Sequence, residues 1–576
     1  MKELKINLKF LSNYFKSSKR LLIMNIILNI LLIITSVVLP IISAKVIVEL
    51  TNYNLKKVLY IAIILVLIRV FSTIINYFRY SSNCKIYNNI LSDLRKDSLK
   101  RIHSLTNQTL DNNSVGLFVK RVKNDSEIIS KTYWRISNDI KSVISTIGTF
   151  IAIFIINKTV FLFALFYLFL IILLDNYNQK KTRKLREITN KESEITTSLI
   201  TETIHGIRDI KMLNIENNTK KLISNQITKL LNGSKKENET NSLIGGFTDI
   251  ISNVCDFLLI ILYIYLIKEN TLSVVNALVL YNYSLGLSSF HGYTGEIANY
   301  ISKFNLSTKR IKELFDNEKF TTEAFGTKHI KKVKGKFEFK SVHFSYKRNE
   351  VLKGVSFTVN PDETVAFVGK TGSGKTTIFN LLCKMYEVDK GEILIDDVNI
   401  NELDKDTIRG NITVISQSPY IFNMSIKENL KLVKPNLTNK EMKEALKTAC
   451  LYDFVESLPD KYDTILGENG ITLSGGQKQR LAIARALIQK TEIILFDEAT
   501  SALDNETQEK ITKAINNMKK EYTIMIIAHR LSTIINADKI FFLNNGKIEY
   551  SGTHEYLLKH SKEYKKLYET EIKTKK

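Results

Sequence analysis

The sequence predicts a multidomain protein in which an all-α transmembrane domain of six helices, with long cytoplasmic helical extensions, is followed by an α/β domain. Three observations predict this fold class. The first part of the 576-residue chain contains six apolar runs, the segments between them show helical spacing of Ile and Leu, and the last part contains a glycine-rich loop between a strand and a helix. We expect an N-terminal segment at 1–20, the transmembrane domain at 21–310, a linker at 311–334 and the α/β domain at 335–576.

Length and cysteine usage exclude several classes of protein. A chain of this length, with long apolar runs confined to its first part, is neither one compact soluble domain nor a disordered polymer. The four cysteines, Cys84, Cys255, Cys383 and Cys450, form no CxxC pair and are too far apart to suggest a disulfide or zinc framework. A reducing compartment therefore fits.

The six apolar runs are expected to cross a membrane. An α-helix rises about 1.5 Å per residue, so about 20 residues span ~30 Å of hydrocarbon. Only residues 157–159, which include Asn157 and Lys158, separate the third run from the fourth, and a short turn at 268–270 joins the fifth to the sixth, so each pair predicts a tight hairpin. Core helices of a large soluble protein are the alternative, but the rest of this chain is too small to bury six of them. The runs lie at 21–46, 58–78, 140–156, 160–174, 247–267 and 272–287.

The distribution of basic residues predicts the orientation of the chain. Residues 1–20 carry six Lys/Arg and one acid, which places the N-terminus in the cytoplasm, and six crossings return the remaining residues there. The first run is too long for a signal peptide and lacks a small-residue cleavage site. The formal net charge of +24 is thus largely explained by basic residues on the cytoplasmic side of the membrane, and we expect no nucleic-acid partner.

The segments at 81–137 and 176–242 are predicted to be helical extensions of the membrane helices. They contain no Pro, few Gly and helically spaced apolar residues, such as Ile86, Ile90 and Leu94. Each is long enough for two helices of about 33 Å. Their tips, near 110–125 and 204–215, would then be placed to contact the next domain.

The glycine-rich sequence GKTGSGKT at 369–376 has the context of a P-loop. It follows an alternating apolar strand at 364–368 and precedes a helix-like segment at 377–385. Its glycines let backbone N–H groups point at phosphates, Lys375 would neutralise the terminal phosphates, and the Thr376 hydroxyl would bind Mg²⁺. A loop that merely turns is the alternative, which this context disfavours. The residues expected to bind ATP here are Gly369, Lys370, Thr371, Gly372, Ser373, Gly374, Lys375, Thr376 and Thr377.

A second buried strand, at 492–496, ends in Asp497 and Glu498. Ligands bind at the carboxyl ends of parallel strands, so Asp497 would hold Mg²⁺, through water, and Glu498 would act as general base on the attacking water. Solvated turn residues are the usual alternative. The P-loop makes the functional interpretation the better one.

The sequence LSGGQ at 473–477, followed by a helix-like run, is by itself a helix-capping turn. Together with the P-loop and the Asp-Glu pair, in this order, it closely resembles the nucleotide-binding domain of ABC transporters, whose own signature is LSGGQ. With six membrane segments in front, nearly the whole chain resembles an ABC exporter half-transporter. Glu468, just before the signature, matches the exporter-type loop that meets the cytoplasmic helix tips.

The resemblance implies further roles. Tyr346 would stack on adenine, although packing is the alternative; Gln417 would contact Mg²⁺ and the attacking water; and His529, after a strand, would contact the γ-phosphate. The signature residues would bind ATP held by a second copy, and Asp504 would lie across the same interface. The signature residues meant here are Ser474, Gly475, Gly476 and Gln477.

The family sandwiches each ATP between the P-loop of one domain and the signature of another, so the resemblance implies a dimer with two ATP sites. A homodimer is the simplest inference, and a heterodimer remains open. ATP binding would bring the domains together and switch the membrane helices from inward-open to outward-open. The implied activity is ATP hydrolysis coupled to export. An importer with the same fold, or an ATP-gated channel or sensor, is the alternative.

The transported substrate is expected to be amphipathic or hydrophobic: a drug, a lipid or a peptide. Arg69, Asp249 and Asp256 lie within or beside apolar runs and are candidates for the lining of a cavity, or else pair structurally or lie at the interface. The Ile-, Lys- and Asn-rich composition suggests an AT-rich bacterial genome. We therefore expect a multi-pass protein of a bacterial cell membrane, in contact with its lipids.

Overall fold

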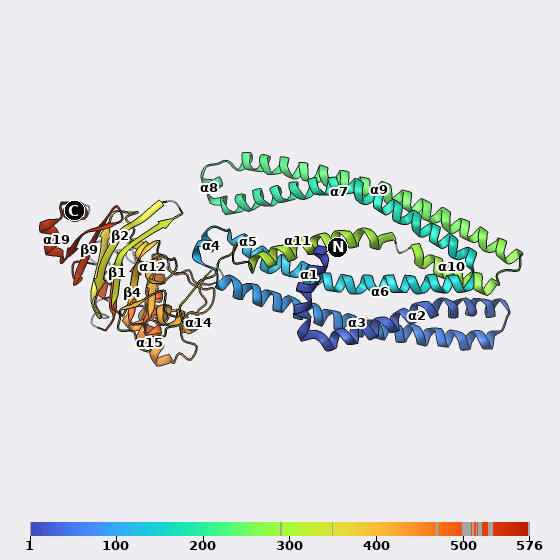
Figure 1. Ribbon diagram of the computed structural model, residues 1–576, viewed down its shortest axis with the longest axis horizontal. Coiled ribbons are helices and arrows are strands. Elements are labelled where there is room, and N and C mark those ends of the chain that lie inside the picture. The colour runs from blue at the N-terminus through green and yellow to red at the C-terminus, as the bar shows by residue number, and fades with distance from the viewer. Residues whose placement is uncertain are drawn as a thin grey trace. The chain divides into compact units, whose positions relative to one another are not determined.

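The computed structural model describes residues 2–288, 291–347, 349–467, 470–497, 509, 512–513, 515, 521–527 and 534–573. The chain divides into two compact units (Figure 1). The first comprises Met1–Ser104 and Asn113–Phe320, and the second comprises Leu105–Asn112 and Thr321–Lys576.

The first unit is all-helical, as the sequence predicts. Five of its helical stretches, among the described residues, are long and apolar enough to cross a membrane: Leu4–Thr51, Leu55–His103, Val115–Ile156, Lys158–His205 and Glu216–Lys268. The sixth predicted run corresponds to the shorter helix α10, Val274–Ser288. Besides α10, the helices of this unit, including those that make up the five long stretches, are α1 (Lys2–Ser12), η1 (Asn13–Ser18), α2 (Lys19–Thr51), α3 (Leu55–His103), α5 (Val115–Lys120), η2 (Arg121–Asp125), α6 (Ser126–Ile156), α7 (Lys158–His205), α8 (Ile207–Met212), α9 (Glu216–Lys268) and α11 (His291–Leu314).

The helices continue well beyond their apolar runs. Helix α3 has 49 residues, α7 has 48 and α9 has 53, so the segments at 81–137 and 176–242 are helical extensions as expected. The expected hairpin between α6 and α7 turns at Asn157, whose side chain accepts hydrogen bonds from the backbone N–H groups of Thr159 and Val160 and so caps α7.

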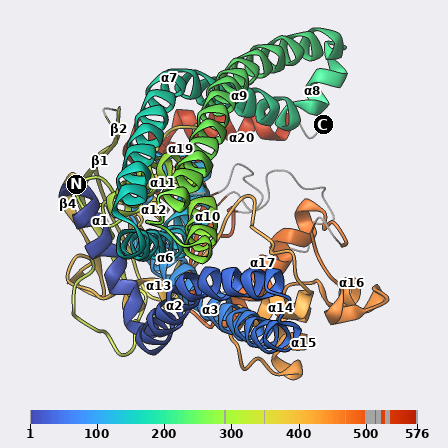
Figure 2. The same cartoon turned by 90° about the vertical axis from the view of Figure 1, so that its right-hand side faces the viewer.

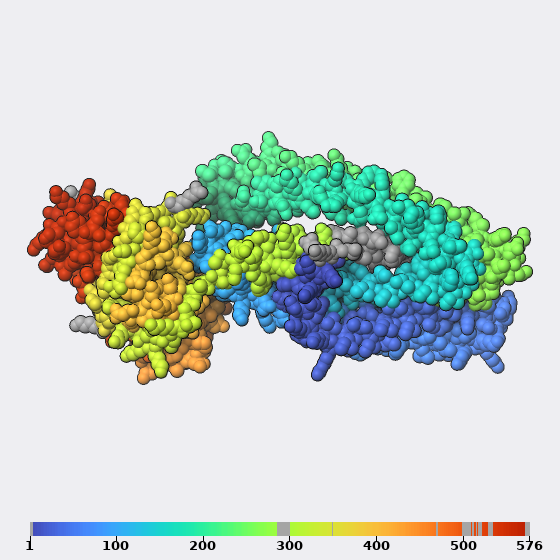
Figure 3. Space-filling view, in the orientation of Figure 1, coloured from blue at the N-terminus to red at the C-terminus, as the bar shows by residue number. Residues whose placement is uncertain are grey.

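The hairpin of α7 and α9 packs against the rest of the first unit along only part of its length. Viewed along the helices, α7 and α9 lie together, and α2 and α3 form a separate pair (Figure 2). In the space-filling view a gap separates the half of the hairpin that ends at α8 from the lime-coloured part of α11 (Figure 3). At the other end, a core that includes Ala164, Tyr167 and Leu259 joins α7 and α9 to α6 and α10.

The second unit contains two sheets. A four-stranded antiparallel sheet has the order β2-β1-β4-β5, and a six-stranded sheet has the order β10-β9-β3-β8-β7-β6, in which all strands from β9 to β6 are parallel. The strands are β1 (Phe337–Tyr346), β2 (Asn349–Val359), β3 (Thr364–Gly369), β4 (Lys390–Ile395), β5 (Val398–Asn399), β6 (Ile412–Ile415), β7 (Ile493–Asp497), β8 (Thr523–Ile527), β9 (Lys539–Asn544) and β10 (Lys547–Gly552).

The central strands explain the position of the site. All six residues of β3 and all five of β8 are buried, because helices or the second sheet cover both faces. Because β3 and β8 are parallel neighbours, their carboxyl ends lie at the same edge of the sheet. The helices of this unit are α4 (Asn107–Asp111), α12 (Lys375–Leu382), α13 (Lys405–Arg409), α14 (Ile426–Lys431), α15 (Asn439–Thr448), α16 (Tyr452–Ser457), η3 (Lys461–Asp463), α17 (Gly475–Gln489), α19 (His554–His560) and α20 (Lys562–Lys573).

Candidate nucleotide-binding site

The glycine-rich loop connects β3 to α12, in the predicted strand, loop and helix order. The helix begins at Lys375, two residues earlier than expected, and ends at Leu382. Lys370, Thr371 and Gly372 are exposed, Ser373, Gly374 and Lys375 are buried, and Thr376 is exposed again. The loop therefore presents its outer half, and the N-terminus of α12, to a ligand.

Two glycines of the loop are required by their surroundings. A Cβ on Gly369 would lie 2.1 Å from the backbone oxygen of Leu543 in the neighbouring strand β9. Gly374 has φ +104°, and a Cβ there would lie 2.6 Å from Cδ2 of Leu352. Close packing at the first position and left-handed backbone at the second thus explain the glycines.

Lys375 is folded back into the loop. Its side chain is only 4% exposed, and Nζ donates hydrogen bonds to the backbone oxygens of Gly369 (2.9 Å) and Lys370 (3.0 Å). A buried ammonium group needs such partners. These contacts hold the charge within the loop, where phosphate oxygens would be neutralised.

The sheet topology brings Thr376 to Asp497. Thr376 is the second residue of α12, after β3, and Asp497 ends β7, two strands away across β8. The Thr376 hydroxyl donates to Oδ1 of Asp497 over 3.3 Å. A hydroxyl and a carboxylate are oxygen donors that Mg²⁺ accepts, together with phosphate oxygens and water, so the pair fits the predicted Mg²⁺ site. In the same loop, Ser373 Oγ is buried and has no hydrogen-bond partner among the described residues, which also fits a loop shaped for a ligand.

Gln417 follows β6, at the same edge of the sheet. Its side chain is exposed, and its backbone oxygen accepts a hydrogen bond (3.2 Å) from Nε2 of Gln479 in α17. The segment after Gln417 is thus connected to the helix that carries the signature sequence.

The signature sequence begins α17 with a capping box. Ser474 Oγ accepts from the backbone N–H of Gln477 (3.3 Å), and the Gln477 side chain accepts from the backbone N–H of Ser474 (2.8 Å). The predicted capping turn is therefore confirmed. Ser474 and Gly475, at the N-terminus of this 15-residue helix, are exposed, whereas Gly476 is buried.

Tyr346, at the end of β1, packs beside α12. Its hydroxyl accepts from Nδ2 of Asn380 (3.2 Å), and its ring makes edge contacts with Phe344 and Tyr386, with centroids 4.8 and 5.2 Å apart. Tyr346 therefore makes packing contacts within this unit. Stacking on adenine remains a prediction for the part of the ring that is still exposed.

Four predicted residues, Glu468, Glu498, Asp504 and His529, lie outside the described residues. Glu498 directly follows the last residue of β7, and His529 comes two residues after the end of β8.

The sequence analysis missed two residues that hold the segment after Gln417 in place. Asn429 is fully buried; it accepts from the backbone N–H of Phe422 (3.1 Å) and donates to the oxygens of Phe422, Met424 and Ser425. Arg485 of α17 donates to the oxygen of Tyr420 (2.8 Å) and to Asn429, and burial lowers the pKa of its guanidinium. No local pattern distinguishes these two residues from ordinary polar residues of helices.

The charged residues within or beside the apolar runs differ in environment. Asp256 in α9 is half-buried, and its buried Oδ1 has no hydrogen-bond partner within the part of the chain that the structure describes. Arg69 and Asp249 are exposed on the surface of the first unit.

Comparisons with known proteins agree with this arrangement. Residues 352–501 match the family described as ABC transporter, and residues 22–289 match that described as ABC transporter transmembrane region. The chain is 31% identical over 492 residues, 84% of each chain, to proteins named putative multidrug export ATP-binding/permease protein in Staphylococcus aureus strains NCTC 8325 and COL. A solved structure described as a bacterial Atm1-family ABC exporter with ATP bound has the same fold, with a TM-score of 0.80 and 23% identity over 96% of this chain and 98% of that one.

Proposed function

This chain belongs to the ABC transporter family, and we propose that it is an ATP-driven exporter that moves an amphipathic or hydrophobic substrate out of the cytoplasm by alternating access. One observation carries the proposal: a unit with a P-loop, and with a signature helix whose N-terminus is exposed, shares its chain with five helices able to span a membrane. The relatives are named as exporters, which favours export over the importer and the channel or sensor.

ATP would bind through the loop at 369–377, with Tyr346 on the adenine and Lys375 at the terminal phosphates. The contact between Thr376 and Asp497 supports placing Mg²⁺ beside them, with Gln417 nearby, where the ion would neutralise phosphate charge. Glu498 would take the proton of the attacking water, and His529 would contact the γ-phosphate. These roles rest on the positions of the residues after β3, β7 and β8.

The working unit would be a dimer, most simply of two copies of this chain. The exposure of Ser474 and Gly475 supports this, because these residues are accessible to ATP held by a second copy. The six Lys/Arg in residues 1–20 support a cytoplasmic N-terminus, in a bacterial cell membrane, with the second unit also in the cytoplasm. Asp256 is the preferred candidate for the cavity lining, because its buried carboxylate oxygen finds no hydrogen-bond partner in the described residues.

Inside-out membrane vesicles test the proposal. ATP should drive the accumulation of at least one member of a panel of fluorescent amphipathic dyes, lipids and peptides, and the same compound should stimulate ATP hydrolysis by the purified protein. Glu498→Gln should abolish both activities yet retain nucleotide in a stable dimer. Parent-level hydrolysis by this variant would refute the general-base role, and dye loss from the vesicles on ATP addition would indicate import.

A further inference from the structure

A short piece of the membrane domain's chain folds with the second unit. Leu105–Asn112, which contains α4, connects α3 to α5, yet it is compact with residues 321–576. Helix α4 is capped by Thr106, whose Oγ1 accepts from the backbone N–H of Thr109. The chain thus leaves the first unit after α3, forms α4 as part of the second unit, and returns to the first unit before α5.

The linker after α11 provides one contact surface for α4. The backbone N–H of Thr106 donates to the oxygen of Thr321 (3.0 Å), and Leu105 forms an antiparallel bridge with Thr322. Leu105 is only 2% exposed, so this contact is packed as well as hydrogen-bonded.

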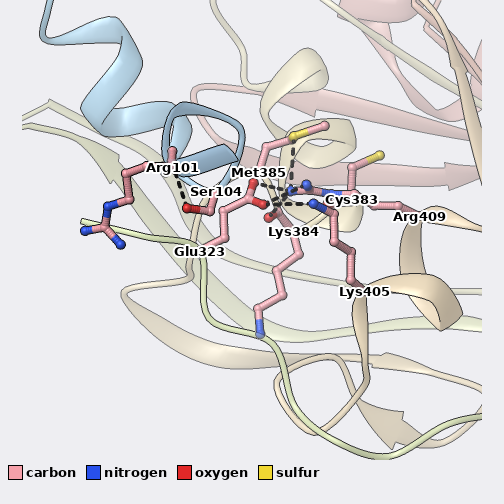
Figure 4. Close-up of polar contacts among 8 residues, drawn as sticks. All are labelled: Arg101, Ser104, Glu323, Cys383, Lys384, Met385, Lys405 and Arg409. Carbon is pink, nitrogen blue, oxygen red and sulfur yellow. Dashed lines mark hydrogen bonds and ion pairs between the residues drawn. The ribbon is translucent and has the colours of Figure 1, made fainter. Parts of the chain in front are cut away.

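The next linker residue, Glu323, is held by Arg409 of α13. Nη1 and Nη2 of Arg409 donate to the two carboxylate oxygens over 3.0 and 2.7 Å, and Nζ of Lys405 lies 3.5 Å away (Figure 4). The Glu323 side chain is 11% exposed. Such a bidentate, largely buried pair fixes orientation as well as distance.

The same guanidinium also holds the far end of the P-loop helix. Nε of Arg409 donates to the backbone oxygen of Cys383 (3.1 Å) and Nη2 to that of Lys384 (3.0 Å), immediately after α12 ends (Figure 4). A cation at a helix C-terminus is favourable. Arg409 therefore connects the linker to the helix whose first residue is Lys375.

A second contact runs in parallel. Tyr386, four residues after α12 ends, donates a hydrogen bond from its hydroxyl to Asp111 in α4, and burial and this carboxylate raise the pKa of the tyrosine. Its ring contacts Tyr346. Helix α4 is thus attached to the C-terminal end of α12 at two points.

We propose that Glu323 and Arg409 are positioning residues for ATP-driven transport. Their ion pair keeps the linker, and with it α4, attached to the C-terminal end of the P-loop helix, so that a nucleotide-driven movement of α12 is passed through α4 to α3 and α5. The inference rests on the proposed function. Neither residue contacts the described residues of the proposed nucleotide site, so loss of the pair should weaken transmission and leave nucleotide binding unchanged.

Three single variants of the full-length protein test the proposal: Glu323→Gln, Arg409→Lys and, as matched control, Glu402→Gln. Glu402 pairs with another linker residue, Lys328, over 3.8 Å, but both side chains are more than half exposed. Arg409→Lys keeps the positive charge but loses the two guanidinium nitrogens that bind both carboxylate oxygens of Glu323, so its effect should be intermediate.

The first readout is hydrogen exchange with saturating Mg·ATP in the Glu498→Gln background. We expect Glu323→Gln to speed exchange of the Thr106 amide about tenfold, since its acceptor Thr321 loses its anchor, and to reduce the ATP-dependent change in exchange at 113–125. The ATP dissociation constant should stay within about twofold of the parent's. Parent-like exchange in both segments, or the same result in Glu402→Gln, would overturn the proposal.

The second readout is dye accumulated per ATP hydrolysed in vesicles, using a dye that the parent accumulates. Glu323→Gln should lower this ratio about tenfold while the ATP concentration for half-maximal hydrolysis is unchanged. A raised ATP requirement with an unchanged ratio would mean that the pair merely supports the nucleotide site. If the parent accumulates no dye, the proposed export function is refuted. The hydrogen exchange at Thr106 and at 113–125 then still decides whether Glu323 and Arg409 are positioning residues.

Discussion

The backbone of the P-loop provides the sharpest quantitative prediction, from a pair of alanine substitutions two residues apart. Gly372 has φ +81° and Gly374 has φ +104°, so both occupy backbone conformations that favour glycine. A Cβ on Gly372 would meet nothing within 4 Å, whereas one on Gly374 would lie 2.6 Å from Cδ2 of Leu352 and 3.4 Å from Cγ1 of Val351. The two substitutions therefore share the backbone cost and differ in the steric one.

Left-handed backbone costs an L-residue about 1–2 kcal/mol. Overpacking at Leu352, which is fully buried, adds about 1–3 kcal/mol. If ATP requires the loop in this conformation, the cost raises the dissociation constant tenfold for every ~1.4 kcal/mol. Gly372→Ala should then weaken ATP binding roughly fivefold to thirtyfold, and Gly374→Ala by at least roughly thirtyfold.

The assay is titration calorimetry of Mg·ATP on the purified full-length protein, with Glu498→Gln present in every variant to prevent turnover. Adding Leu352→Ala to Gly374→Ala should restore part of the affinity, because it removes the clashing methyl group. The reasoning is refuted if Gly374→Ala binds ATP as tightly as Gly372→Ala, or if the Leu352 truncation brings no recovery while the protein stays folded by thermal melting.

Three further predictions concern single side chains. Thr376→Val removes the hydroxyl that contacts Asp497, so affinity for Mg·ATP should fall about tenfold while affinity for ATP without Mg²⁺ stays unchanged in calorimetry; an equal loss in both would contradict the Mg²⁺ role. Burial raises the pKa of the Cys383 thiol to about 12, so iodoacetamide at pH 8 should alkylate it about a thousandfold more slowly than an ordinary exposed thiol; rapid labelling by mass spectrometry in the folded protein would disprove this. Hydrogen bonds from Lys434 and from the backbone of Thr438 lower the pKa of Glu441 to about 2, so this group stabilises the fold fully above about pH 4.5 and the contribution is lost as the pH falls toward 2; a carboxyl NMR titration, assigned with Glu441→Gln, should show that midpoint, and one near 4.5 would be inconsistent with these bonds.

The sequence predicted the local elements because their signals are short-range. The apolar residues at 364–368 and the glycines after them predict a strand and a loop within a dozen residues, and the structure confirms both. The Ser474 cap of α17 was likewise visible in its own neighbourhood. The helical extensions at 81–137 and 176–242 followed from the absence of Pro and the spacing of apolar residues.

By itself, then, the sequence determined which segments are helices and strands, which could enter a membrane, and which residues have nucleotide-site chemistry. Only the tertiary structure decided what each element is attached to: α4 folds with the second unit, Thr376 contacts Asp497 across 121 residues of sequence, and Glu323 contacts Arg409 across 86. The physical reason is that periodicity and helix caps reflect interactions within a few residues, whereas the order of strands and the position of a linker depend on packing between residues far apart in the sequence.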